Sequence, residues 1–150
     1  MRQAIELSRE GMLSGVGGPF GAVVVTGGAI LASGQNRVLA DNDPTAHAEI
    51  VAIRAACRLL DRFQLVGCEL YTSCEPCPMC LGAIHWSRLE RVHYANTRAD
   101  AADIGFDDDR FHRELGRPLA DRAIPMHQLL RDEALLIFQE WKAKPDKQGY

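Results

Sequence analysis

The stretch TSCEPCPMC, residues 72–80, places three cysteines and two prolines within nine residues, and this combination strongly constrains the fold of the chain. Proline is favoured in the first turn of a helix, so Pro78 predicts a helix that begins there with Cys77 as its N-cap. Cys80 then lies one turn further along, on the same side of the helix. The two thiols can share one metal ion, so we expect a metal site at the start of this helix.

Cys74 differs from the other two cysteines because Pro76 biases Glu75 away from helical angles. The chain between Cys74 and Cys77 is then extended, and the Cys74 sulfur is expected to diverge from the other two. A site in which Cys74 also binds the metal remains the alternative. The choice matters because a closed structural zinc site needs four protein ligands, whereas a catalytic zinc site keeps one position open.

A third ligand is available in the stretch PTAHAE, residues 44–49, where His47 lies near the start of another expected helix. Glu49 follows two residues later, and in the middle of a helix two such side chains would diverge by about 200°. In a first turn, where the backbone is only entering helical angles, both can approach one pocket. The predicted ligands are therefore His47, Cys77 and Cys80, with Glu49 as a non-ligand carboxylate beside the open position.

This set of donors is typical of a catalytic zinc site. Zinc lowers the pKa of a bound water towards ~7, and Glu49 can take the released proton and deliver it to a ring nitrogen and then to a departing amine. The order H-x-E followed by P-C-x-x-C is the pattern of zinc nucleobase deaminases. The alternative is a purely structural zinc module, which would need Cys74 as a fourth ligand and would leave Glu49 without a role.

Composition limits the classes of protein that remain. A chain of 150 residues with 47% apolar content predicts one domain, 1–150, and the formal charge of -3 disfavours an electrostatic hold on nucleic acid or membrane. No apolar run reaches the roughly 20 residues of a membrane span, and Met1 opens an amphipathic pattern rather than a signal peptide. Five cysteines, three of them crowded together, fit metal ligation in a reducing compartment, so we expect a cytoplasmic protein.

Hydrophobic periodicity predicts an α/β fold. Gly27 and Gly28, between two apolar runs, predict a tight hairpin, and Asp43 and Pro44 predict the N-cap and first residue of the helix that carries His47. Later units alternate between helix and strand, which predicts parallel strands between layers of helices. Helices are expected at 4–13, 42–60, 78–88 and 131–142, strands at 19–25, 29–34, 68–73, 91–96 and 124–130, and a tail at 145–150.

Longer strings resemble a known family. The strings GGPFGAVVV, GQN, NDPTAHAEI, LYTSCEPCPMCLGAI and GFDD resemble the small bacterial guanine deaminases of the cytidine deaminase superfamily, almost from end to end. The resemblance implies a three-layer fold with a five-stranded mixed sheet, one zinc per chain, and hydrolysis of guanine to xanthine and ammonia by hydroxide on zinc. It implies zinc ligands at His47, Cys77 and Cys80 and a proton shuttle at Glu49.

The resemblance also implies residues that bind the substrate. Asn36 matches a position against the purine edge, Phe20 a position against its face, and Asp108 a position near the exocyclic amine, where it would help the amine leave. Tyr150 matches a C-terminal tyrosine that enters the pocket of a partner subunit, so a homodimer is expected. Cys74 matches a position that is not a ligand. The string KQGY differs from the family before its last residue.

Several alternatives stay open. The tRNA adenosine deaminases share HAE and PCxMC with this chain, but they must bind a polyanionic RNA and flip a base out of it. The acidic balance of the chain and the GFDD string favour a free base, and other aminated heterocycles are further alternatives. Asp108 is also compatible with a solvated acidic turn, Phe20 with the first core position of its strand, and residues 145–150 with a frayed end.

Overall fold

The computed structural model of the protein describes residues 1–149. Its sheet is mixed, with the strand order β2-β1-β3-β4. The first two strands form the predicted antiparallel hairpin across Gly27 and Gly28, β3 is antiparallel to β1, and β4 is parallel to β3. The strands are β1 (Gly21–Thr26), β2 (Ala29–Gln35), β3 (Cys68–Cys74) and β4 (Arg91–Asn96). The mixed α/β sheet expected from the sequence is confirmed.

The predicted number of five strands is wrong for the part of the chain that the structure describes, where the sheet has four. Residues 124–130, the expected fifth strand, are exposed and form no strand. A strand is stabilised by pairing with a neighbour, and an alternating apolar pattern supplies only a face for packing. The pattern at 124–130 was therefore insufficient to specify a strand.

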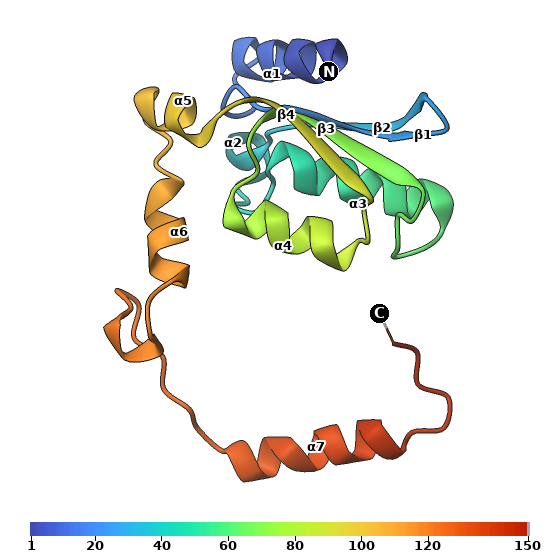
Figure 1. The fold of residues 1–150 in the computed structure, drawn as a ribbon, viewed down its shortest axis with the longest axis vertical. Coiled ribbons are helices and arrows are strands. Elements are labelled where there is room, and N and C mark those ends of the chain that lie inside the picture. Colours follow the sequence, from blue (N-terminus) through green and yellow to red (C-terminus); the bar gives the residue numbers. More distant parts are fainter. Residues whose placement is uncertain (150) are drawn as a thin grey trace. The chain divides into compact units, whose positions relative to one another are not determined.

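Helices cover both faces of the sheet (Figure 1). Helix α1 (Arg2–Leu13) packs on one face, chiefly against β1, and helix α3 (Ala48–Leu60) packs on the other with α4 (Pro78–Trp86) beside it. The main core lies between the sheet and α3, and it includes Cys68 and, at its margin, Cys57. This is the three-layer arrangement that the sequence predicts. No helix among the described residues is long and apolar enough to cross a membrane.

Helix α3 begins later than predicted. Asp43 does not cap it, because its Oδ1 accepts hydrogen bonds from Thr45 N at 2.8 Å and Thr45 Oγ1 at 2.7 Å in a local turn. Such Asx turns offer the backbone an alternative to the helix. The helix starts at Ala48, with His47 as its N-cap in an extended conformation. The short helix α2 (Val38–Asp41) lies just before this turn.

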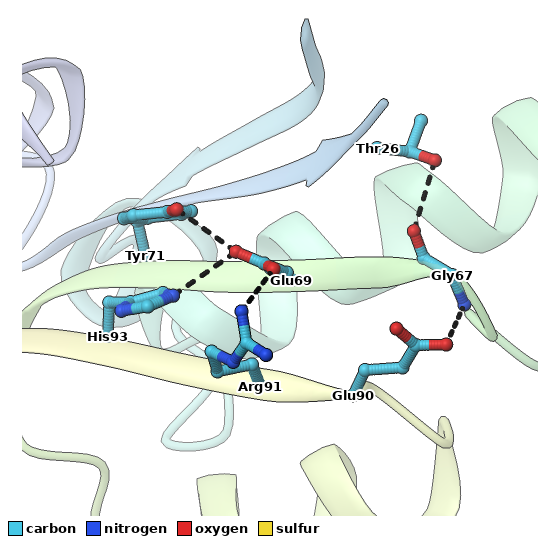
Figure 2. A network of polar contacts seen from close by, with 7 residues as sticks. All are labelled: Thr26, Gly67, Glu69, Tyr71, Glu90, Arg91 and His93. Atoms are coloured by element: carbon cyan, nitrogen blue, oxygen red, sulfur yellow. Dashed lines mark hydrogen bonds and ion pairs between the residues drawn. The ribbon is translucent and has the colours of Figure 1, made fainter. Parts of the chain in front are cut away.

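Polar side chains join β3 to β4 on one face of the sheet, as Figure 2 shows. The Glu69 carboxylate accepts hydrogen bonds from Tyr71 Oη at 3.0 Å and Arg91 Nη1 at 3.0 Å, and His93 Nε2 lies 3.1 Å from its Oε2. The rings of Tyr71 and His93 stack with centroids 4.4 Å apart. These contacts support the parallel register, which places Cys74, at the end of β3, opposite Asn96 at the end of β4.

The chain divides into two compact units, Met1–His112 and the residues from Arg113 onwards. The first unit contains the sheet and also helix α5 (Arg98–Asp103) and the start of helix α6 (Asp109–Leu115). The second contains a 3-10 turn (Leu119–Asp121) and helix α7 (Arg131–Ala143), which confirms the helix predicted at 131–142.

Candidate active site

Three metal-ligating side chains lie together at the starts of two helices. His47 Nδ1 lies 3.6 Å from Cys77 Sγ and 3.6 Å from Cys80 Sγ, and all three donor atoms lie within 4.8 Å of one another. Cys77 is the N-cap of α4 and Pro78 occupies its first turn, as the sequence predicts. Cys74 lies outside this cluster, although it is also buried.

The spacing of the cluster fits zinc. A tetrahedral ion with Zn–S bonds of about 2.3 Å and a Zn–N bond of about 2.0–2.1 Å holds sulfur and nitrogen roughly 3.5 Å apart, close to the two observed distances. Two cysteines and one histidine are donors that zinc accepts readily, and they leave one of the four positions for water or substrate. The donor set is therefore that of an open zinc site.

The pKa values of the two thiols of the cluster shift in opposite directions. The hydrogen bond from Cys80, aided by His47, lowers the pKa of Cys77 to about 4 against the opposing effect of burial. The same Cys77–Cys80 contact and burial raise the pKa of Cys80. Burial raises the pKa of Cys74 to about 11, so this residue stays a neutral thiol at neutral pH. Cys77 thus already offers the thiolate that a metal needs.

Glu49 lies beside the cluster in the first turn of α3 and is buried. Its Oε1 accepts a hydrogen bond from Thr72 Oγ1 at 2.9 Å, and its Oε2 lies 3.4 Å from Cys80 Sγ. Burial raises the pKa of the Glu49 carboxyl, and the hydrogen bond from Thr72 acts in the opposite direction. The carboxyl is thus held next to the metal donors, in an environment that lets it hold or release a proton.

A cavity of about 370 Å³ opens beside the cluster within the first unit. It brings together six of the predicted site residues, namely Phe20, Asn36, His47, Glu49, Cys77 and Asp108, and Cys74 also lines it. Cys80 belongs to the metal cluster beside them, and Tyr150 lies outside the described residues. The size suits a small ring system, since ligand pockets begin at roughly 300 Å³.

Asn36 is buried and held in one orientation. Its Oδ1 accepts hydrogen bonds from Gly18 N at 3.3 Å and Val38 N at 3.2 Å. The amide nitrogen is therefore left to donate to a ligand. A Cβ atom at Gly17 would lie 2.2 Å from Asn36 Oδ1, so only glycine fits at this close approach. Gly17 thus helps to shape the cavity that it lines.

Aromatic rings form one wall of the cavity. Phe20 and Phe106 meet edge to face with their centroids 4.8 Å apart. Phe20 also packs, partly buried, against the main core, so it lies both at the cavity and at the margin of the core. Phe106 was not among the residues predicted to line the site, although its place in the GFDD string close to Asp108 was the available signal.

Asp108 follows Phe106 along the cavity wall, where burial raises the pKa of its carboxyl. Glu75 also lines the cavity, and its Oε2 accepts a hydrogen bond from Arg98 N at 3.1 Å. Its own N–H donates to Asn96 O at 2.8 Å. Glu75 therefore links the loop of the cysteines to helix α5. This link was not predicted, because a glutamate before a proline has the appearance of a surface residue.

Comparison with known proteins places the site in a family. The model of the cytidine and deoxycytidylate deaminase zinc-binding region matches residues 1–96. The match covers more than half of the chain, and the chain belongs to this family of zinc-dependent deaminases. Zinc is accordingly its cofactor, in agreement with the donors that the structure brings together.

Guanine deaminases are similar to this chain over almost its whole length. The guanine deaminase of Bacillus subtilis (strain 168) is 52% identical over 150 residues, which cover 100% of this chain and 96% of that one. The X-ray structure of the B. subtilis enzyme superposes with a TM-score of 0.96 over 99% of this chain and 95% of that chain. The guanine deaminase from Nitrosomonas europaea is 36% identical with a TM-score of 0.68, covering 95% of this chain and 82% of its own.

A second kind of deaminase also matches this chain. The tRNA-specific adenosine deaminase of Aquifex aeolicus is 48% identical over 77 residues, which are 51% of either chain. Similarity to the B. subtilis guanine deaminase thus extends along the whole chain, whereas the sequence matches to the tRNA-specific adenosine deaminases of A. aeolicus and Haemophilus influenzae cover 51% and 75% of it.

Proposed function

We propose that this protein hydrolyses guanine to xanthine and ammonia. The observation that carries the proposal is the cavity. Zinc donors, a buried carboxylate and two aromatic rings lie together in it, and its volume suits a purine. The end-to-end identity of 52% with a guanine deaminase supports the choice of base.

The geometry of the cluster supports the proposed roles at the metal. His47, Cys77 and Cys80 hold the ion, and Glu49 is close enough to act without binding it. When bound, zinc makes a water molecule acidic enough to serve as a nucleophile at neutral pH. Glu49 would take one proton of this water and deliver it to a ring nitrogen of guanine, and it would then pass the second proton, from the hydroxyl added to the ring, to the departing amine.

The base is held by groups of complementary polarity. Asp108 accepts hydrogen bonds from the N1–H and the exocyclic amine of guanine, and then helps the amine leave as ammonia. Asn36, whose oxygen is occupied by two backbone N–H groups, donates to an acceptor on the purine edge. Phe20 and Phe106 supply apolar surface for the ring. Adenine carries an acceptor at N1 instead, so it does not satisfy Asp108.

A panel of substrates assayed for ammonia tests this proposal. We expect release of ammonia from free guanine, little from adenine or adenosine, and only weak dependence of the rate on salt. A protein that releases ammonia from adenosine in tRNA, and not from guanine, would contradict it.

The tRNA adenosine deaminases are the second candidate, favoured by the 48% identity over 77 residues. An enzyme of that kind neutralises many phosphates, so its affinity falls steeply as salt rises. The formal charge of -3 argues against such a hold. Nucleic acid is therefore not the partner that we propose.

We also propose that the active form is a cytoplasmic homodimer, built from a single deaminase domain at 1–150 whose tail 145–150 covers the site of the partner subunit. Helix α7 supports a partner, because Phe138 is 75% exposed and Ile137 is 61% exposed. Tyr150 at the end of the tail would close the purine pocket against water. The free state of all five cysteines supports the reducing compartment.

A further inference from the structure

Thr72 is the polar residue of strand β3 that faces helix α3. Its neighbours on the same face of the strand are Cys68 and Leu70, and all three side chains are fully buried, with 0% exposure. A hydroxyl that is removed from water costs free energy unless it is hydrogen-bonded. An apolar β-branched residue would fill this position without that cost, so the hydroxyl itself calls for an explanation.

The partner of this hydroxyl is the carboxylate of Glu49. Thr72 Oγ1 donates to Glu49 Oε1 at 2.9 Å, and the contact joins residues 23 positions apart in the sequence. Because Thr72 is β-branched and lies in a strand, its side chain has few rotamers available. The donor is therefore a rigid one, fixed by the sheet rather than by a loop.

The hydrogen bond distinguishes the two carboxylate oxygens of Glu49. Oε1 is held by Thr72, whereas Oε2 lies 3.4 Å from Cys80 Sγ, on the side of the metal donors. Rotation of the carboxylate about its terminal bond has a broad, roughly two-fold profile, so that bond alone does not fix the plane of the group. A donor on one oxygen does fix it.

We propose that Thr72 is a positioning residue that holds Glu49 with Oε2 directed at the place where metal and substrate meet. The inference rests on the proposed function, because it assigns Thr72 a part in the proton transfer by Glu49. Proton transfer requires the carboxylate oxygen to lie within hydrogen-bond reach of the groups it serves. Thr72 acts through Glu49 and touches neither metal nor base.

The test replaces Thr72 by valine, which keeps the shape of the side chain and removes the hydroxyl. We expect Thr72→Val to bind zinc as the wild type does, with KM for guanine nearly unchanged and kcat lowered by about 10–100-fold, as for other residues that orient groups at a metal site. Thr72→Ser restores the hydroxyl and should recover most of the lost rate. A crystal structure of Thr72→Val should show the Glu49 carboxylate turned away from its original plane.

Ser73 offers a matched control, because it is the next residue, is also buried, and has a hydrogen bond elsewhere. Its Oγ accepts from Gly21 N at 3.0 Å, away from Glu49. Ser73→Ala should lower stability without the selective loss of kcat. Thr72→Ala, which also lacks the hydroxyl, replaces Thr72→Val if the valine variant does not fold.

A double variant separates positioning from a merely structural role. If Thr72 acts through Glu49, then adding Thr72→Val to Glu49→Gln should not reduce the residual rate further. A wild-type kcat in Thr72→Val, an equal loss of kcat in Ser73→Ala, or additive losses in the double variant would overturn the inference. The proposed function fails separately, since it requires the wild-type protein itself to release ammonia from guanine.

Discussion

His47 and Glu49 show how the position of a residue in its helix decides what it can do. In the middle of a helix they would point about 200° apart, yet both line one cavity. The reason is that His47 is the N-cap of α3, with φ of -67° and ψ of 154°, and only the residues after it are helical. A proton carrier can thus lie two residues from a metal ligand without binding the metal.

Replacement of Glu49 by glutamine tests this division of roles. Glu49→Gln keeps the shape of the side chain and removes its ability to carry a proton. We expect about one zinc per chain and a fall in kcat for guanine of at least the ~10²–10⁴ typical of general acid-base catalysis. Metal analysis and steady-state kinetics on the same preparation check both expectations. Turnover at the wild-type rate would remove Glu49 from the mechanism.

Substitutions of Cys74 and of Cys77 test whether three or four protein side chains bind zinc. Both thiols are buried, but only Cys77 belongs to the His47–Cys80 cluster. Cys74→Ser should leave the zinc content unchanged, because the Cys74 sulfur contacts Thr97 O at 3.7 Å instead. Cys77→Ala should lower it, since it removes one of three donors. Zinc loss in Cys74→Ser would indicate a closed structural site with four ligands.

At the scale of elements, the site depends on how closely α3 approaches the sheet. A Cβ atom at Gly34, in β2, would lie 2.4 Å from Ala48 O and 2.6 Å from Ala52 N of α3. The strand and the helix therefore meet backbone against backbone. Because α3 carries His47 and Glu49 at its start, this contact also sets how close these two residues lie to the sheet.

The close approach of α3 to β2 predicts that replacing Gly34 by alanine and replacing Gly82 by alanine change the stability of the protein in opposite directions. Gly34→Ala should destabilise the protein by about 1–3 kcal/mol, since added atoms in a packed region force the backbone apart. Gly82→Ala, in α4, meets nothing within 4 Å and should stabilise the helix by about 0.5–1 kcal/mol. Urea denaturation of the two variants measures both values. Equal stabilities would show that α3 is free to shift away from β2.

At the scale of the whole molecule, the chain contains a unit with the sheet and a C-terminal unit of a different character. The described residues of the second unit are mostly exposed, and helix α7 presents Ile137, Phe138 and Trp141 to solvent. Ile137 and Phe138 lie four and three residues before Trp141, so the three side chains share a face. Apolar side chains grouped in this way are typical of surfaces that another chain covers. This supports the proposed dimer, in which the tail reaches the partner.

Deletion of residues 145–150 tests the role of the tail. We expect the truncated protein to fold and to bind zinc, because the donors and the core lie in the first unit. Its turnover of guanine should fall, since Tyr150 would no longer close the pocket. The oligomeric state is measured on the same sample, and a fully active truncated protein or an active monomer would contradict the proposal.

Mixing two inactive variants tests the same proposal by a gain of activity. The truncated chain retains a good metal site, and full-length Glu49→Gln retains a good tail. If the tail crosses between subunits, heterodimers of the two should regain activity that neither partner has alone. Mixtures without added activity would mean that each tail serves its own subunit.

The sequence by itself determined the features that depend on neighbours within a few residues. Pro78 and Cys77 mark the start of α4, and the spacing of Cys77 and Cys80 places two sulfurs on one side of it. Helix starts and hairpins are encoded locally because their hydrogen bonds close over a few residues. Even there, the predicted N-cap at Asp43 is wrong, because its side chain accepts a hydrogen bond from Thr45 N in a local turn.

Only the tertiary structure decided which distant segments meet. Phe20 contacts Phe106, Glu49 accepts from Thr72, and Glu75 binds the backbone of Arg98. These contacts depend on the sheet order β2-β1-β3-β4 and on the register that sets Cys74 beside Asn96. The failure of 124–130 to form a strand has the same cause. A strand or a pocket wall is completed by a segment far along the chain, and the local sequence pattern does not indicate which segment that is.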